Sequence, residues 1–113
     1  MFYKVIYTDN EFLIPKKFAG MTYLVLIFIK PEYKNDFGLL HHEMTHVKQF
    51  YKNPLHSFLY KFSKKYRLKS EVEAYKEQLN YYDVDRSQLF AQFISEKYNL
   101  DITVEQAQQL LKS

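Results

Sequence analysis

The residues best suited to chemistry form the sequence His42-Glu43-Met44-Thr45-His46. On a helix, residues four positions apart lie one turn above each other on the same face, so both imidazoles can reach one metal ion. Zinc accepts imidazole nitrogens at about 2.0–2.1 Å in a tetrahedral shell. Glu43 would lie beside the ion rather than on it, where its carboxylate can act on a water that zinc activates. We therefore interpret His42 and His46 as zinc ligands and Glu43 as the general base.

The helix that carries this motif also has an apolar face to anchor it. At about 100° per residue, four apolar side chains form one stripe. They are Leu40, Met44, Val47 and Tyr51. His42 and His46 lie almost opposite that stripe. The motif could arise by coincidence, but the stripe, the helical context and the preceding strand favour metal binding.

A catalytic zinc site needs a third protein ligand, and the candidates are Glu71 and Glu73. The helix around them has an apolar face made of Leu68, Val72, Tyr75, Leu79 and Tyr82. Glu71 lies at the edge of that face, whereas Glu73 lies nearly opposite. A glutamate that points into an apolar interface must be paired or bind a metal. We favour Glu71 as the third ligand over a salt bridge to a lysine or arginine, and we assign Glu73 to solvent or to a capping box with Ser70.

Two further histidines, His41 and His56, are interpreted as ordinary surface or hydrogen-bonded residues. His41 lies about 100° from His42 around the helix, so it cannot easily join the same metal. His56 follows the helix break at Pro54, from which it could approach the site.

Strand patterns precede helix patterns along the chain, which predicts an α+β fold. Strands are expected over residues 2–7, 11–14 and 22–30, and the last of these is apolar on both faces. Helices are expected over about residues 37–53, from residue 54, and over about residues 68–82, 87–98 and 104–112. We predict caps at Asn35 or Asp36 and at Asn53, Asp85 and Thr103. A small N-terminal β-sheet should pack on the H-E-x-x-H helix and a glutamate helix, with further C-terminal helices.

Composition limits the classes of protein that this chain can represent. It has 113 residues, a formal net charge of +3 and no cysteine. The length supports one domain. The lack of cysteine excludes a disulfide scaffold and a cysteine nucleophile, and it fits a reducing, cytoplasmic location. No secretory signal is visible, and the apolar run over residues 23–29 is far shorter than the roughly 20 residues of a bilayer span.

The densest basic stretch runs from Lys61 to Lys69, with aromatic residues between the charges. It contains Lys61, Lys64, Lys65, Arg67 and Lys69, with Tyr60, Phe62 and Tyr66 interleaved. Such a pattern can bind nucleic acid. We favour a solvated helix face with inward-pointing aromatics, because acidic residues dilute the charge elsewhere.

The pattern His42-Glu43-x-x-His46, followed about 25 residues later by Glu71-x-Glu73-Ala74, resembles the gluzincin metallopeptidases. It is most similar to minigluzincins and to the catalytic domains of membrane peptidases such as HtpX, the CAAX prenyl proteases and BlaR-type antibiotic sensors. The resemblance covers about residues 22–82 and implies that Glu71 is the third zinc ligand. The membrane relatives carry an aspartate where this chain has Tyr75, so the support of one zinc-binding histidine is altered. The resemblance implies a soluble, minimal member without their transmembrane helices.

We therefore predict a zinc-dependent endopeptidase in which Glu43 is the general base and a peptide or protein is the substrate. The strand before the motif helix could pair with extended substrate, and Tyr75 is one candidate for stabilising the oxyanion. One alternative is a zinc-binding module without turnover. A second is a basic nucleic-acid-binding domain that uses the stretch from Lys61 to Lys69.

The last part of the chain needs its own hypothesis. We assign residues 1–98 to a minimal metallopeptidase domain and residues 99–113 to a C-terminal segment. Because small relatives can be made as latent forms, this segment could occlude the cleft, with Asp101 close to the metal. It could also dock on a neighbouring chain and cause self-association, or it could be a simple packing helix.

Overall fold

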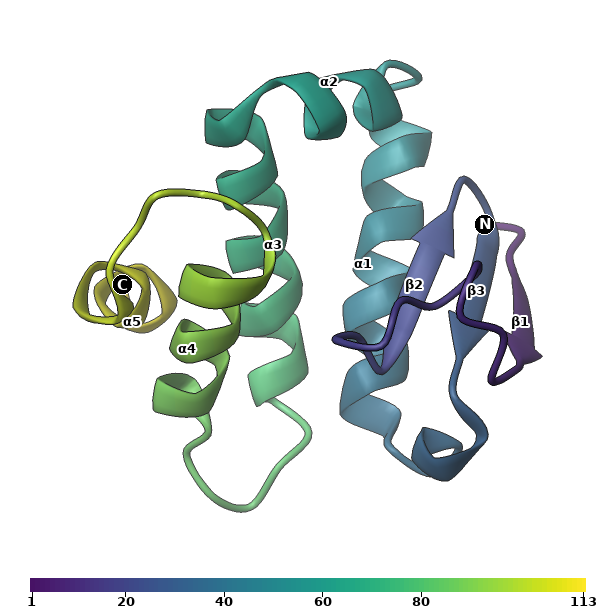
Figure 1. Ribbon diagram of the computed structural model, residues 1–113, viewed down its shortest axis with the longest axis horizontal. Coiled ribbons are helices and arrows are strands. Elements are labelled where there is room, and N and C mark those ends of the chain that lie inside the picture. The colour runs from purple at the N-terminus through teal and green to yellow at the C-terminus, as the bar shows by residue number, and fades with distance from the viewer.

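The protein, described over residues 1–113 by a computed structural model, has the predicted α+β fold, with a three-stranded sheet followed by five α-helices (Figure 1). The strands are β1 (Lys4–Tyr7), β2 (Gly20–Tyr23) and β3 (Leu26–Ile29). The helices are α1 (Phe37–Lys52), α2 (His56–Phe62), α3 (Lys64–Leu79), α4 (Ser87–Lys97) and α5 (Val104–Lys112), and a short 3-10 helix, η1 (Pro31–Tyr33), precedes α1. None of these helices is both long and apolar enough to cross a membrane.

The sheet has the order β1-β3-β2, with β1 parallel and β2 antiparallel to β3. The single strand predicted over residues 22–30 is wrong, because the chain folds back at Leu24 into a two-residue hairpin. Leu24 has a φ of 57°, a conformation that usually calls for glycine or asparagine. The strand predicted over residues 11–14 is also wrong. That segment forms a turn in which the backbone NH of Ile14 donates to the carbonyl of Asn10, and Ile14 is fully buried.

Helix α1 begins and ends where the sequence predicts. The side chain of Asp36 accepts a hydrogen bond from the backbone NH of Leu39 at 3.0 Å, which caps the helix. The apolar stripe packs against the sheet, where Val47 is fully buried in a cluster with Ile27 and Ile29. This packing fixes the helix and leaves its histidine-bearing face turned toward α3.

The next two helices begin at other residues than predicted. Helix α2 starts at His56, because Asn53 accepts a hydrogen bond from the backbone NH of Leu55 in a turn that precedes the helix. Helix α3 starts at Lys64, four residues early, because the side chain of Ser63 accepts from the backbone NH of Tyr66. The capping box predicted for Ser70 and Glu73 is therefore wrong, since both residues lie inside α3.

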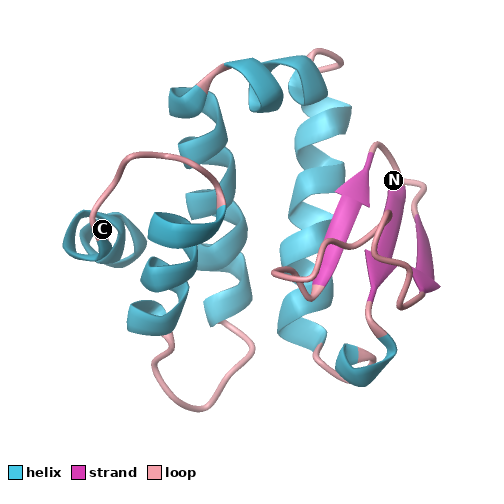
Figure 2. Ribbon diagram, in the orientation of Figure 1, coloured by secondary structure: helices cyan, strands magenta, loops and turns pink.

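Helices α3, α4 and α5 share a second apolar core. Its buried members are Tyr75, Phe90, Ala91, Ile94, Leu100, Ala107 and Leu111. The predicted cap of α5 is confirmed, because Thr103 and Gln106 form a complete capping box. Helix α2 joins α1 to α3, which run side by side, and α5 lies on the far side of α3 and α4 from the sheet (Figures 1 and 2). The seam between the two cores is formed by α1 and α3.

Candidate metal centre

Three side chains converge at the seam between α1 and α3. His42 and His46 come from α1 and Glu71 comes from α3, and one ligand atom of each lies within 4.8 Å of the others. Nε2 of His42 lies 3.2 Å from Oε1 of Glu71, and Nε2 of His46 lies 3.2 Å from Oε2. All three residues are buried, with at most 8% of their surface exposed. The structure thus brings together the three residues that the sequence singles out as metal ligands.

The donor set fits a divalent metal ion. Oε1 of Glu71 is buried and has no hydrogen-bond partner, because its contact with His42 lacks hydrogen-bond geometry. A buried carboxylate oxygen without a donor is costly, and a cation held between the carboxylate and the imidazoles would satisfy it. No lysine or arginine pairs with Glu71, so the salt bridge considered as an alternative is wrong. Two imidazoles and one carboxylate are a ligand set typical of catalytic zinc.

The electrostatics of the metal-free site are dominated by the pairing of His46 with Glu71. Burial alone disfavours protonation of His46, but the negative charge of Glu71, whose Oε2 lies 3.2 Å from Nε2, outweighs it and raises the pKa of His46 from 6.5 to about 9. Burial likewise disfavours ionisation of Glu71, but both histidines lower the pKa of this carboxyl well below its usual range. A proton on His46 therefore occupies the place that a metal ion would take.

Glu43 lies beside the triad and is held there by the sheet. The hydroxyl of Thr22, on β2, donates to Oε1 of Glu43 at 2.8 Å. Oε2 of Glu43 lies 4.0 Å from Nε2 of His42. Gly20 leaves room for this carboxylate, because a Cβ at that position would lie 3.3 Å from Oε2 and 3.1 Å from the carbonyl oxygen of Phe28. The edge strand therefore positions the predicted base.

Behind the triad, His46 is supported by a buried polar network that the sequence analysis missed. Nδ1 of His46 lies 2.9 Å from Oε1 of Gln49 and 3.3 Å from Oγ of Ser70. Nε2 of Gln49 donates to the carbonyl of Ser70 at 3.1 Å and to Oε1 of Glu73 at 2.6 Å. Glu73 is exposed, as predicted, but it also anchors this network. Gln49 follows His46 by three residues, a helical spacing that could have indicated the contact.

Tyr75 occupies the position where the resemblance places an aspartate. Its hydroxyl pairs with the hydroxyl of Tyr98 at 2.6 Å, and its ring packs edge-on against His42 with the centroids 4.3 Å apart. Nδ1 of His42 consequently has no hydrogen-bond partner. Tyr75 supports His42 by packing alone, and it does not line the cleft described below.

Two residues of α2 lie beside the site: Tyr60, which the sequence analysis did not name there, and His56, which it interpreted as a surface or hydrogen-bonded histidine able to approach the site. The hydroxyl of Tyr60 donates to Oε2 of Glu71 at 2.5 Å. His56 is buried, its Nδ1 lies 2.7 Å from the hydroxyl of Tyr66, and its ring lies 6.3 Å from that of His46. His41 stays outside the site, as predicted, and stacks on Tyr81.

The metal centre opens into a cleft of about 700 Å³. The cleft is lined by β2, by the segment before it, by α2 and by the end of α4. Of the C-terminal segment only Asn99 lines it, while α5 packs against α3 and α4. Asp101 is exposed and pairs with Lys64, so it does not approach the triad. Occlusion of the cleft by residues 99–113 stays a prediction.

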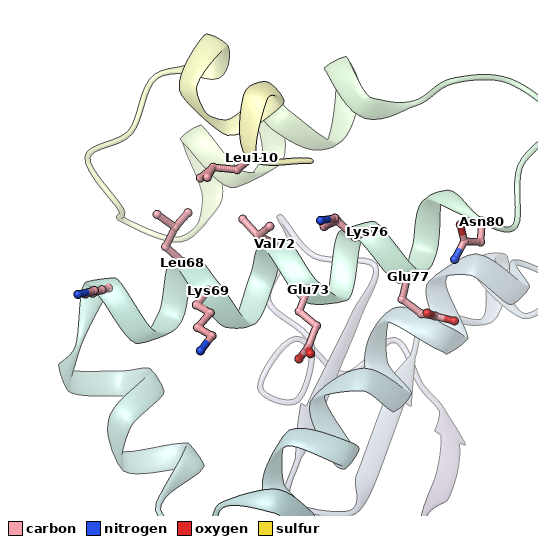
Figure 3. Close-up of a pocket in the computed structure, with 9 residues that line it drawn as sticks. Leu68, Lys69, Val72, Glu73, Lys76, Glu77, Asn80 and Leu110 are labelled. Atoms are coloured by element: carbon pink, nitrogen blue, oxygen red, sulfur yellow. The ribbon is translucent and has the colours of Figure 1, made fainter. Parts of the chain in front are cut away.

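A second depression, of about 750 Å³, lies on the outer face of α3 and contains none of the triad. Figure 3 shows Leu68 and Val72 on the side of α3 that faces Leu110, with Lys69 and Glu73 on another side. Its charged residues are Lys65, Lys69, Glu73, Lys76 and Glu77. Both signs of charge are present, and no group of metal-binding side chains lies there.

Comparisons of the chain with protein-family models, with curated proteins and with solved structures found no match.

Proposed function

We propose that the protein is a zinc-dependent endopeptidase, a minimal member of the gluzincin group similar to the minigluzincins. The observation that carries this proposal is the convergence of His42, His46 and Glu71 at a cleft, with Glu43 beside them. These three side chains would hold the ion and leave an open position on the cleft side. When bound, zinc would supply Lewis acidity toward a water molecule and the scissile carbonyl.

Glu43 is the general base in this proposal. Its Oε1 is held by Thr22, and its Oε2 lies beside the imidazole of His42. A carboxylate fixed in this way can take a proton from the attacking water at Oε2 and return it to the leaving amine. Because Glu43 is buried and held by a hydrogen bond, little reorganisation is needed when the proton moves.

The edge of the sheet supports a peptide as the substrate. β2 is an edge strand, and Gly20, Met21, Thr22 and Tyr23 all line the cleft. An extended peptide can add to such an edge through backbone hydrogen bonds. This mode of binding needs no chain terminus of the substrate, which is why we propose an endopeptidase.

Tyr60 replaces Tyr75 as the candidate for stabilising the oxyanion. Its hydroxyl lies in the cleft beside Glu71, whereas the hydroxyl of Tyr75 is paired away from the cleft with Tyr98. Burial and the charge of Glu71 raise the pKa of Tyr60 far above its ordinary value, so the hydroxyl keeps its proton, which it would donate to the oxyanion in place of Glu71.

The test is the variant Glu43→Gln in the full chain, assayed on a quenched fluorescent peptide together with zinc content. We expect zinc to be retained and turnover to fall by at least about a hundredfold. Glu32→Gln is the matched control, because Glu32 is exposed in η1 and touches neither the triad nor the cleft. Zinc binding without turnover in the parent would instead favour a zinc-binding module, and equal turnover in Glu43→Gln would refute the assigned base.

A further inference from the structure

Outside the metal centre, every charged side chain that lines the cleft is basic. These residues are Lys17, Lys61, Arg67 and Lys97. The only acidic residues in the lining are Glu43 and Glu71, which belong to the site itself. The second depression, by contrast, mixes its lysines with Glu73 and Glu77. Outside the metal centre the charges of the cleft are therefore all positive, whereas the second depression carries both signs.

None of these four cations forms an ion pair with a carboxylate of the chain. The ion pairs formed by lysine are Lys64 with Asp101 and Lys112 with Asp85, and none of those residues lines the cleft. The ammonium groups of Lys17, Lys61 and Lys97 lie over phenylalanine rings, at 5.2, 5.4 and 3.8 Å from the ring centroids. Such contacts orient a cation but leave its charge available to a bound anion.

Arg67 is fixed in position by neutral partners. Its Nη1 donates to the carbonyls of Tyr60 at 2.8 Å and Lys61 at 3.1 Å, and its Nη2 donates to the carbonyl of Asn99 at 3.4 Å. Its Nε is buried and has no partner. The guanidinium therefore keeps its full charge in a preorganised position, which lowers the entropic cost of binding an anion.

Lys17 and Lys97 come from opposite sides of the cleft. Lys17 lies in the segment between β1 and β2, and Lys97 is the last residue of α4. The rings of their neighbours Phe18 and Tyr98 lie 5.4 Å apart, which brings the two segments together. An anion in the cleft could therefore contact both walls.

The lysines at this end of the cleft repel one another. Burial lowers the pKa of Lys97, and Lys30 and Lys17 lower it further, against the opposite effect of Glu96. Like charges held together in this way are unfavourable in the free protein, and a bound anion would relieve the repulsion.

We propose that the cleft selects acidic peptide segments, whose aspartate or glutamate side chains pair with Arg67, Lys17 and Lys97. The inference rests on the proposed peptidase function and names its substrate class. A peptide fits better than a nucleic acid, because the cleft that holds these four cations has a volume of only about 700 Å³ and the chain carries only +3. A polynucleotide needs an extended basic track.

The binding test uses the full chain carrying Glu43→Gln, with and without zinc, and three fluorescein-labelled probes of equal length. The probes are a glutamate-rich peptide, a twin in which glutamine replaces every glutamate, and single-stranded DNA made of thymidines. We expect the glutamate-rich peptide to bind about tenfold more tightly than its twin at low salt, with the difference shrinking as salt rises. Equal binding of the twins, or tighter binding of the DNA than of the acidic peptide, would overturn the proposal.

The lysines are tested by the double variant Lys17→Gln and Lys97→Gln. We expect it to weaken binding of the glutamate-rich peptide by about fivefold and to leave the twin unchanged. Lys48→Gln with Lys52→Gln is the matched control, because it removes the same charge from exposed positions of α1 outside the cleft. An equal loss in the control would assign the effect to net charge and contradict the proposal.

Cleavage of the twin peptides by the parent separates this inference from the proposed function. Cleavage that depends on Glu43 but proceeds with equal kcat/KM on both twins would keep the peptidase and overturn the acidic preference. No cleavage of either twin, with the acidic preference in binding intact, would support a basic cleft that binds acidic peptides and overturn the peptidase assignment.

Discussion

The side-chain oxygen of Gln49 lies 2.9 Å from Nδ1 of His46, one turn further along α1. The amide nitrogen of Gln49 donates to the carbonyl of Ser70 and to the carboxylate of Glu73, so the oxygen must face the histidine. Nδ1 then carries the proton and donates it, which leaves Nε2 of His46 free to bind a metal. A hydrogen bond of this kind fixes both the tautomer and the ring orientation of a ligating histidine.

We expect Gln49→Ala to lower the affinity for zinc by about 10- to 100-fold, because His46 loses this orienting contact. Gln49→Glu keeps an acceptor for His46 but replaces the amide that donates to Ser70 and Glu73 with a carboxylate oxygen, so it should recover only part of the affinity. Competition with a chromophoric chelator measures both variants. Gln92→Ala, an exposed position of α4, is the control for loss of a glutamine. Parent-like zinc affinity in Gln49→Ala would show that the contact does not support the metal site.

Thr22→Val tests whether the sheet positions the general base. The substitution keeps the shape of the side chain but removes the hydroxyl that donates to Glu43 at 2.8 Å. We expect kcat to fall by about tenfold while zinc content and thermal stability stay close to those of the parent, because only the orientation of the carboxylate changes. A loss of zinc, or no change in kcat, would contradict the role assigned to Thr22.

The affinity for zinc should depend on pH in a way that reports the environment of His46. Its pKa is raised from 6.5 to about 9, and zinc binds only the deprotonated imidazole. The apparent affinity should therefore keep rising up to about pH 9, by as much as about tenfold per pH unit. Titrations in buffers of low metal affinity measure this dependence. A plateau already at pH 7 would mean that Glu71 does not hold the proton on His46.

The same two groups predict how the stability of the metal-free protein depends on pH. The raised pKa of His46 contributes stability that is fully present below pH 6.5 and is lost as the pH rises through about 9. The lowered pKa of Glu71 contributes stability that is present above its ordinary value of 4.5 and is lost as the pH falls. Urea unfolding with a chelator present should therefore give the highest stability between about pH 5 and 6.5. A maximum above pH 9 would contradict the pairing.

The sequence predicts the parts of the site that depend on helical spacing. His42 and His46 lie one turn apart, Asp36 caps their helix, and Glu71 lies at the edge of an apolar face. Each of these features follows from local periodicity, and each reappears in the structure. The α+β class follows in the same way, from strand patterns that precede helix patterns.

The features that the sequence does not predict depend on tertiary context. The hairpin turns at Leu24, where no glycine or asparagine marks the turn, so the apolar run reads as one strand. Tyr60 and His56 reach the site only because α2 spans the ends of α1 and α3. The sequence suggests Ser70 as a cap of α3, whereas in the structure Ser63 caps this helix and Ser70 lies inside it. Local patterns carry no information about which helix will face which.

Truncation after Tyr98 tests the C-terminal segment. It would remove Leu100, Ala107 and Leu111 from the core that they share with α3 and α4. We expect the shortened chain to lose its folded structure, because removing a single buried leucine side chain already costs about 2–5 kcal/mol. Circular dichroism and thermal melting measure the outcome. A folded, more active truncated protein would instead support occlusion of the cleft by residues 99–113.

The most direct test of the central claim is the zinc content of the full chain purified without added metal, compared with His46→Ala and His41→Ala. His41 is the matched control, because it lies on the same helix but stacks on Tyr81 outside the triad. We predict about one zinc ion per chain in the parent and in His41→Ala, and a loss of zinc in His46→Ala. No zinc in the parent after reconstitution, or equal zinc in His46→Ala, would contradict the metal centre and the peptidase function built on it.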